Sequence, residues 1–191
     1  MAIELIFETH SLTVDNEAGI ATGWLPGELS PLGRELAREL GGRHRDRQLA
    51  AVFVSDLARA VETAAIAFAG RHVPIRTDSR LRECNYGMLN GMPVARLTTT
   101  RRQHITEPYP GGQSYQQVVD QMRSFIRSLA AQYDDRTVLV IAHSANKWAL
   151  DYLLKGRRLA ESVDAPFDWQ EGWTYHVPPG WTVETTNRGS A

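Results

Sequence analysis

Four short apolar runs alternate with helical segments along this chain, and this alternation constrains the fold more than any other feature. A strand followed by a helix and a second parallel strand packs as a layered unit, with helices on the faces of the sheet. The run near residue 140 is apolar at almost every position, as in a strand buried on both faces. We therefore expect an α/β fold, a three-layer α/β/α sandwich with a mostly parallel central sheet. The expected strands are residues 3–8, 49–55, 73–77 and 136–144.

Capping residues predict where the helices between these strands begin and end. Ser30 followed by Pro31 predicts a helix start, and Gly41 with Gly42 predicts the end of that helix. Ser55 is expected to cap the following helix. The residues expected on the buried faces are Leu32, Leu36 and Leu40 in the first helix, and Leu57, Val61, Ala64, Ala65 and Phe68 in the second.

The second half of the chain carries a capping box and a hairpin signal. Ser114 and Gln117 form an S-x-x-Q pattern, which predicts the start of a long helix. Two aromatic-rich runs, 173–177 and 181–185, flank a Pro-Pro-Gly sequence and predict a hairpin. Residues 186–191 are expected to form a loose tail.

Residues 78–112 form an irregular segment, and we expect its part from 84 to 112 to cap the site. Tyr86 in this segment offers apolar contact to a substrate. Arg101, Arg102 and His104 could reach a second anionic group, although a solvated face is the more common place for such a basic cluster.

Composition narrows the class of protein. With 191 residues the chain is expected to form one domain, residues 1–191. The net charge of −1 includes no basic footprint for nucleic acid, and no apolar run reaches the roughly 18 residues of a membrane span. The single cysteine, Cys84, cannot form an internal disulfide, which fits a reducing compartment. We expect a cytoplasmic protein with a small anionic substrate and no nucleic-acid or membrane partner, and leave the oligomeric state open.

Polar residues follow three of the expected strands. His10 follows the first, Ser55 ends the second, and His143 with Ser144 ends the last. Because ligands bind beyond the carboxyl ends of parallel strands, these side chains and Arg59 should meet at one edge of the sheet. Two imidazoles, a guanidinium and two helix N-termini make a suitable pocket for a phosphate group.

The same stretches resemble the histidine phosphatase superfamily, the phosphoglycerate-mutase-like fold. That family has a first strand ending in R-H-G, a later S-D-L-x-R-A-x-x-T-A block and a last strand ending in H-G. The match keeps the family's order over about residues 3–154. The matching stretches are THSLTVDN (9–16), GW (23–24), LSPLG (29–33), SDLARAVETA (55–64), RLRECNYGMLNG (80–91), YPGGQSYQQV (109–118) and VLVIAHS (138–144).

The resemblance implies a phosphomonoester hydrolase that acts on a small phosphorylated metabolite. His10 would attack phosphorus and become phosphohistidine, while Arg59 and His143 would hold the phosphoryl oxygens. Glu83 would be the general acid and base. No cofactor and no metal are expected, because these side chains supply the charge. The substrate contacts expected in addition are Thr9, Ser11, Asn16, Thr22, Gly23, Arg82, Ser144 and Lys147.

The chain departs from the family motif on both sides of His10. Thr9 stands in place of arginine and Ser11 in place of glycine. Losing one charge-assisted contact costs about 1.5–3 kcal/mol if nothing compensates. Three explanations are open: Lys147 or Arg82 supplies the missing charge, the substrate is less charged or lacks phosphate and the site performs other hydrolytic or acid–base chemistry, or the protein binds a ligand without turnover.

Overall fold

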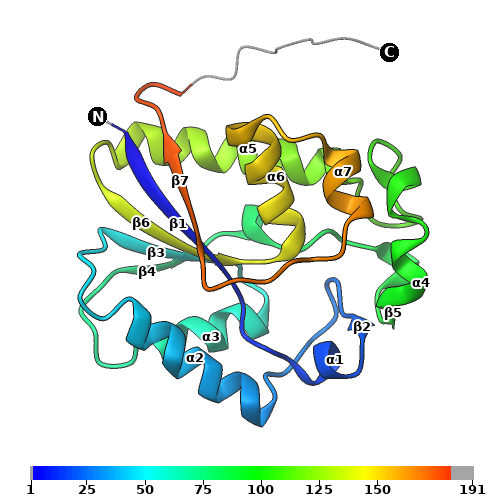
Figure 1. The fold of residues 1–191 in the computed structure, drawn as a ribbon, viewed down its shortest axis with the longest axis horizontal. Helices are drawn as coiled ribbons and strands as arrows, with labels where there is room; N and C mark the ends of the chain where they lie inside the picture. Colours follow the sequence, from blue (N-terminus) through cyan, green and yellow to red (C-terminus); the bar gives the residue numbers. More distant parts are fainter. Residues whose placement is uncertain (1, 182–191) are drawn as a thin grey trace.

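The structure is a computed structural model that describes residues 2–181. Its central sheet has the strand order β4-β3-β6-β1-β7, in which β7 alone runs antiparallel to its neighbour (Figure 1). The α/β fold with a mostly parallel sheet is therefore confirmed. The strands are β1 (Ile3–Thr9), β3 (Ala51–Val54), β4 (Ile75–Thr77), β6 (Thr137–Ala142) and β7 (Trp173–Val177).

Helices cover both faces of this sheet, with α2 and α3 on one side and α5 and α6 on the other (Figure 1). The main helices are α2 (Pro31–Arg43), α3 (Ala58–Ala67), α5 (Tyr115–Gln132), α6 (Ser144–Lys155) and α7 (Leu159–Asp164). Short elements fill the connections: α1 (Val14–Glu17), β2 (Ile20–Ala21), β5 (Met92–Pro93), α4 (Val94–Thr98) and the 3-10 turns η1 (Ser79–Leu81), η2 (Gly87–Leu89) and η3 (Arg101–His104).

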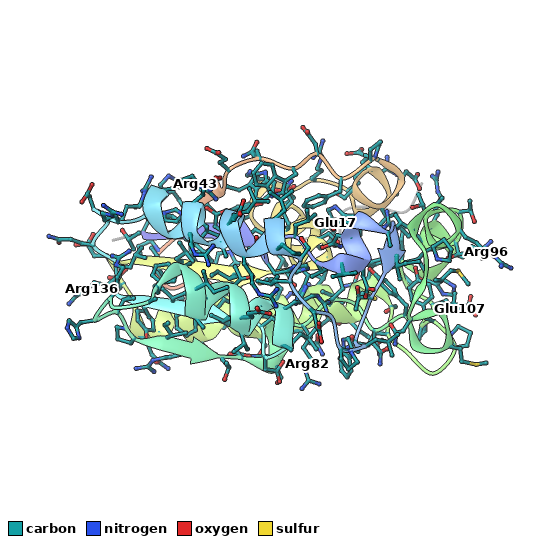
Figure 2. The ribbon with its side chains drawn as sticks, turned by 90° about the horizontal axis from the view of Figure 1, so that it is seen from below. Glu17, Arg43, Arg82, Arg96, Glu107 and Arg136 are labelled. Carbon is teal, nitrogen blue, oxygen red and sulfur yellow. The ribbon has the colours of Figure 1, made fainter. Side chains whose placement is uncertain are left out.

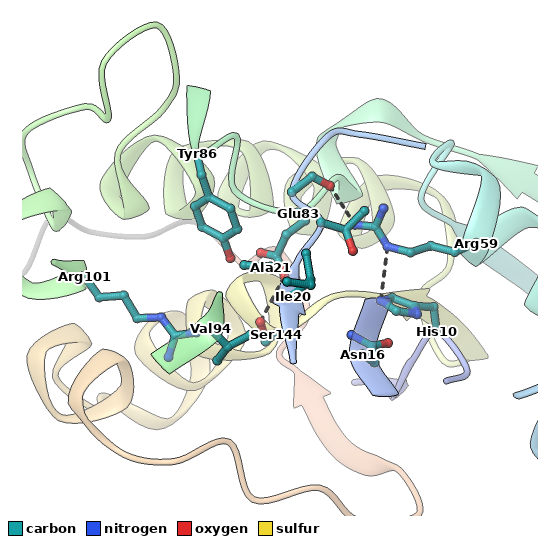
Figure 3. A pocket seen from close by; sticks show the side chains of 12 residues that line it. His10, Asn16, Ile20, Ala21, Arg59, Glu83, Tyr86, Val94, Arg101 and Ser144 are labelled. Atoms are coloured by element: carbon teal, nitrogen blue, oxygen red, sulfur yellow. Dashed lines mark hydrogen bonds between the residues drawn. The ribbon is translucent and has the colours of Figure 1, made fainter. Parts of the chain in front are cut away.

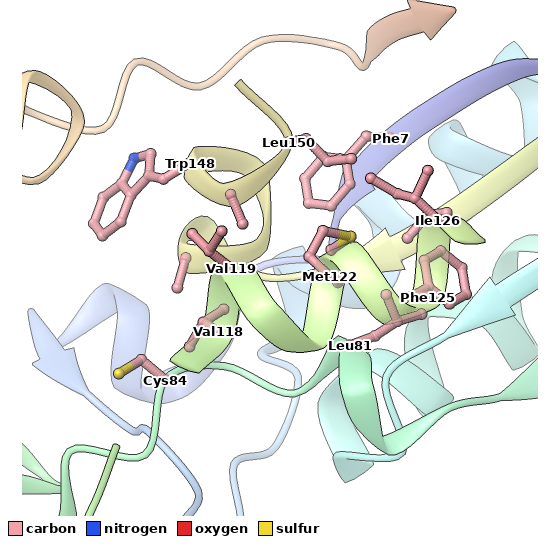
Figure 4. Close-up of a cluster of buried hydrophobic side chains, with 14 of the residues drawn as sticks. Phe7, Leu81, Cys84, Val118, Val119, Met122, Phe125, Ile126, Trp148 and Leu150 are labelled. Carbon is pink, nitrogen blue, oxygen red and sulfur yellow. The ribbon is translucent and has the colours of Figure 1, made fainter. Parts of the chain in front are cut away.

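Two apolar cores hold the layers together. The larger core lies between the sheet and the helices α5 and α6, and Figure 4 shows Phe7, Met122 and Trp148 within it. The smaller core joins the opposite face of the sheet to α2 and α3, and includes Ile6 and Ile141. Because β1 and β6 contribute to both cores, the strands that precede His10 and His143 are packed on both faces.

The α2 helix differs from the prediction at its end and on its buried face. It continues through Gly41 and Gly42 to Arg43. A Cβ atom on Gly41 would lie 2.1 Å from the carbonyl oxygen of Ala67, so this glycine allows α2 and α3 to approach closely. The buried face contains Gly33, Ala37, Leu40 and Gly41, whereas Leu32 is 49% exposed.

The α3 helix begins two residues later than predicted. Its N-cap is Leu57, so the prediction that Ser55 caps the helix is wrong. The predicted buried face is also wrong in part, because Val61 is 39% exposed and Ala65 is exposed. The helix instead buries Ala60, Ala64 and Ala67 among its apolar residues, together with Arg59 and Thr63. Small residues dominate this face because α2 packs so near.

The β7 strand has a pairing that the sequence did not predict. It lies beside β1, with Ile3 opposite Val177 and Phe7 opposite Trp173. Of the second predicted arm only Trp181 falls within the described residues, and the tail 186–191 lies outside them. Across the described part of the chain, no helix is both long and apolar enough to cross a membrane.

The two ends of the molecule differ in what they carry. Seen from below in Figure 2, Arg136 lies at one end, and Arg96 and Glu107 lie at the other. Since Arg136 directly precedes β6, the end with Arg96 and Glu107 is the one that the carboxyl ends of the parallel strands face. The irregular segment 78–112, which contains Arg96 and Glu107, therefore lies over the strand ends, where a site in this class of fold is expected.

Candidate active site

Two histidines and one arginine from distant parts of the sequence meet at this edge. His10 follows β1, and its backbone N–H donates to the carbonyl of Ala142 at the end of β6 over 2.8 Å. The rings of His10 and His143 are 4.9 Å apart between centroids. Arg59 donates from Nε to His10 Nε2 over 3.3 Å and from Nη2 to His143 Nδ1 over 3.4 Å (Figure 3 draws the contact with His10). The structure therefore brings together the three groups that sequence reasoning placed at one edge.

Hydrogen-bond partners fix the tautomer of His10. Its Nδ1 lies 2.7 Å from the carbonyl oxygen of Ser11, which can only accept, so Nδ1 carries the proton. Its Nε2 faces the Nε–H of Arg59, which can only donate, so Nε2 carries the lone pair. Both contacts indicate the same tautomer, so the lone pair of His10 lies at Nε2, beside the Arg59 guanidinium.

His143 is buried behind His10 and is held by a serine. The ring is 1% exposed, and its Nε2 lies 2.8 Å from the fully buried Ser55 Oγ. Because Nδ1 accepts from Arg59, Nε2 carries the proton and donates to this hydroxyl. The prediction that Ser55 follows the second strand is confirmed, but its predicted role as a helix cap is wrong. No sequence pattern indicated that Ser55 would orient His143.

Burial and charge keep both imidazoles neutral. Burial, helped by the nearby Arg59 charge, lowers the pKa of His10 from 6.5 to about 3. Burial, with Arg59 and then His10, places the pKa of His143 well below its ordinary value. Neutral imidazoles keep their lone pairs at neutral pH, which a nucleophile needs. Arg59 remains charged, since a guanidinium does not lose its proton in proteins.

Glu83 lies at the N-terminus of α6, beside the two histidines. Its Oε1 accepts from the backbone N–H groups of Cys84, over 2.8 Å, and Ala145, over 3.3 Å. Its Oε2 accepts from the Ser144 hydroxyl over 2.9 Å. The indole of Trp24 donates to the Glu83 carbonyl over 2.6 Å. The carboxylate is thus held in place by the backbone N–H of the next residue and by the first turn of α6. That turn includes Ser144, which replaces a family glycine.

A cavity of about 100 Å³ opens beside His10. In Figure 3, His10, Arg59 and Asn16 lie on one side of it, Arg101 lies on the other, and Glu83 and Ser144 lie between. The lining residues are His10, Asn16, Ile20, Ala21, Thr22, Gly23, Arg59, Glu83, Tyr86, Val94, Arg101 and Ser144. Seven of the predicted site residues are therefore among them.

The connection between β1 and α2 presents Asn16, Thr22 and Gly23 to this cavity. Asn16 uses its Oδ1 to accept from the backbone N–H of Thr13, which leaves its amide N–H groups for a ligand. The Thr22 hydroxyl donates to Asp15 over 2.7 Å. The Gly23 carbonyl accepts from Arg59 Nη2 over 2.8 Å and so orients the guanidinium.

Two predicted substrate contacts have structural partners instead. The Ser11 hydroxyl donates to the Gly33 carbonyl over 2.6 Å, and the Ser11 backbone N–H donates to Thr63 Oγ1. Ser11 therefore ties the loop to α2 and α3 and does not line the cavity. Arg82 forms a bidentate ion pair with Asp56, at 2.6 and 2.7 Å, and likewise lies outside the lining.

Lys147 is also engaged away from His10. Its Nζ lies 2.6 Å from Asp151, and its side chain is largely buried against the ring of Trp173. It lines a separate, open hollow of about 380 Å³, shared with Asp151, Lys155 and Arg157. Both cations proposed to replace the missing arginine are thus paired with carboxylates elsewhere.

Thr9, which stands where the family has arginine, contacts a tryptophan. The Trp169 Nε1–H donates to Thr9 Oγ1 over 3.2 Å. Neither residue lines the cavity. No sequence pattern indicated this contact, because it joins residues 160 positions apart.

Arg101 lines the cavity, although a solvated face is the more common place for such a residue. It is 9% exposed, its guanidinium lies 5.2 Å from the centre of the Trp148 ring, and its Nε has no hydrogen-bond partner in the described structure. Burial raises the pKa of the neighbouring Tyr86 well above its ordinary value, so Tyr86 faces the cavity as a neutral phenol. The arginine therefore presents a largely uncompensated charge to the cavity.

Comparison with known proteins agrees with the motifs and the fold. A profile of the histidine phosphatase superfamily (branch 1) matches residues 5–176. The chain belongs to this superfamily. Among solved structures, the histidine phosphatase fold of this chain is similar to Bacillus stearothermophilus YhfR, with a TM-score of 0.80 and 26% identity over 94% of this chain and 96% of the other.

Related superfamily members include both phosphatases and mutases. A 2,3-bisphosphoglycerate-dependent phosphoglycerate mutase of Cytophaga hutchinsonii is 30% identical over 159 residues, 76% of this chain and 74% of its own. Phosphoserine phosphatase 1 of Hydrogenobacter thermophilus is 26% identical over 171 residues, 83% of this chain and 79% of its own. A mycobacterial glucosyl-3-phosphoglycerate phosphatase in complex with VO3 has a TM-score of 0.74 and 29% identity, covering 84% and 85% of the two chains. The chain described in this structure is accordingly an enzyme of the phosphatase kind.

Proposed function

We propose that the chain is a phosphomonoester hydrolase that acts through a phosphohistidine on His10. The observation that carries this proposal is the convergence of His10, His143 and Arg59 beside one small cavity. A phosphoryl group placed there would meet the lone pair of His10 and the guanidinium of Arg59, with the neutral imidazole of His143 buried behind them.

In the first step, His10 Nε2 attacks phosphorus and the bond from phosphorus to the ester oxygen breaks. The Nδ1–H donated to the Ser11 carbonyl keeps the ring oriented and stabilises the charge that develops on it. Arg59, which rests on the nucleophilic nitrogen, moves its donor to the phosphoryl oxygens. Glu83, when protonated, gives its proton to the departing oxygen.

In the second step, water replaces the alcohol. Glu83 takes a proton from the water, whose oxygen attacks phosphorus as the bond to His10 Nε2 breaks. Inorganic phosphate and neutral His10 are the products. Hydrogen bonds from α6 and Ser144 hold the carboxylate in one position for both steps.

Arg101 suggests the class of substrate. Among residues 2–181, Arg101 has no carboxylate partner, and burying an unpaired guanidinium is unfavourable. An anionic ligand would offset this cost. Because Arg101 and His10 lie on opposite sides of the cavity, we propose a small phosphorylated metabolite with a second anionic group (Figure 3). A cytoplasmic location remains a prediction.

The test compares the natural protein with His10→Ala on a generic aryl phosphate. We expect turnover by the natural protein, none by His10→Ala, and acid-labile, base-stable phosphate trapped on the natural protein alone. Equal turnover by both proteins would contradict the role of His10. Turnover of neither, with both proteins folded, would favour the alternatives of non-phosphate chemistry or ligand binding.

The substrate class is tested separately with Arg101→Met, which keeps a long side chain and removes the charge. We expect KM to rise at least tenfold for a phosphorylated carboxylic acid and to change little for the aryl phosphate. Equal changes for both substrates would contradict a second anionic group at Arg101.

A further inference from the structure

The contact between Trp169 and Thr9 lies at the position where this chain departs most from its family. Trp169 belongs to residues 165–172, which connect α7 to β7. Its indole N–H donates to the hydroxyl of Thr9, the residue directly before His10. In the described residues this is the one hydrogen bond made by the Thr9 side chain.

The connection that carries Trp169 is anchored on both sides. Phe167 packs between Trp148 and Trp173, with ring centroids 6.5 and 5.9 Å away. Gly172, at a φ of +82°, lies against Glu8, where a Cβ atom would be 3.0 Å from the carboxylate. Although Trp169 itself is 53% exposed, its backbone is thus fixed near Thr9.

The Thr9 hydroxyl lies on the sheet face that leads to α6. Side chains alternate along a strand, so Thr9 shares the face of Phe7, which packs in the core beneath α5 and α6. Thr9 is paired with Ala142, the last residue of β6, and α6 starts two residues later. Thr9 therefore ends β1 beside the start of α6, the helix N-terminus at which a phosphoryl group would be held.

A threonine hydroxyl has one proton to donate and can accept two hydrogen bonds. Trp169 occupies one acceptor position, and no residue between 2 and 181 accepts the proton of Thr9. An indole N–H can only donate, so Trp169 cannot compete for that proton. The arrangement leaves the Thr9 proton available for a ligand.

We propose that Trp169 is a positioning residue that acts through Thr9 in place of the family's arginine. Its N–H fixes the acceptor side of the hydroxyl and turns the Thr9 proton towards a phosphoryl oxygen held at His10. This inference rests on the proposed phosphatase function. The missing guanidinium is thereby replaced by a neutral donor, so the site stabilises less negative charge than the family motif would.

The experiment is a double-mutant cycle on the aryl phosphate. Thr9→Val and Trp169→Phe should each lower kcat/KM by about 3–10-fold, the range of one neutral hydrogen bond. The double variant should match Thr9→Val, because Trp169 acts only through the hydroxyl. Thr9→Ser, which keeps the hydroxyl, should lose less than Thr9→Val. Trp181→Phe, a tryptophan outside the cavity lining, is the control and should behave as the natural protein.

Several outcomes would overturn this inference. One is an unchanged kcat/KM for Trp169→Phe. Another is a further loss when Trp169→Phe is added to Thr9→Val, since a structural role would act in either background. If the natural protein is inactive, or is as active as His10→Ala, the proposed function itself fails. Activity that depends on His10 but not on Trp169 rejects the Trp169 role alone.

Discussion

The hydrogen bond between Ser55 and His143 gives a prediction that depends on a single atom. Ser55→Ala removes the hydroxyl that accepts from His143 Nε2 over 2.8 Å. Both side chains are almost completely buried, so water cannot replace it without opening the structure. A buried donor left without a partner costs about 1–3 kcal/mol. We expect the free energy of unfolding to fall by about that amount.

Urea denaturation measures this change directly. With an m-value of about 2 kcal/mol per molar, the midpoint should fall by roughly 0.5–1.5 M. The turnover of an aryl phosphate should fall as well, by about tenfold, because the imidazole would lose its fixed orientation.

Ser162→Ala is the matched control for this experiment. Ser162 is also buried, but its hydroxyl has no hydrogen-bond partner among the described residues. Removing it should leave stability unchanged or raise it. If Ser55→Ala and Ser162→Ala have the same midpoint, the tautomer and partner assigned to His143 are wrong.

Three further predictions concern other parts of the molecule. Gly41→Ala should destabilise the fold by about 1–3 kcal/mol, because its Cβ would meet a carbonyl of α3. Gly42→Ala has no atom within contact distance of its new Cβ and should stabilise the fold by about 0.4–1 kcal/mol. Thermal unfolding of the two variants measures this difference. Ser144→Ala should lower kcat about 3–10-fold by releasing Glu83, as steady-state kinetics will measure, and an unchanged kcat would refute this. In NMR titrations His10 should stay neutral from pH 8 to 5. Because its pKa falls from 6.5 unfolded to about 3 folded, the unfolded chain binds the proton first, and stability should decrease as pH falls below about 6.5.

The parts of the fold that follow from local pattern were predicted well. The apolar runs before His10 and His143 became adjacent parallel strands because their residues had no polar face to expose. The capping box at Ser114 is present, with the Gln117 side chain accepting from the Ser114 backbone N–H as expected. Once two strand ends are neighbours, the meeting of the two histidines follows from the topology.

The parts that depend on contacts between distant segments were missed. Ser55 looks like a helix cap, and only the position of His143 shows its other use. Lys147 lies one turn beyond His143, but Asp151 on the same helix holds it away. Arg101 resembles a solvated residue because its burial comes from Trp148, which lies 47 positions later. Sequence spacing cannot report these partners, since each arises from tertiary packing.

The position of β7 affects how the molecule can form. The strand that leads to His10 leaves the ribosome long before β7, so one of its sides stays uncovered until Val177 has been made. A truncated product that ends before Trp173 would present an unpaired, hydrophobic edge to other chains. Chaperone dependence and aggregation of nascent protein should therefore concentrate in chains that stop short of β7.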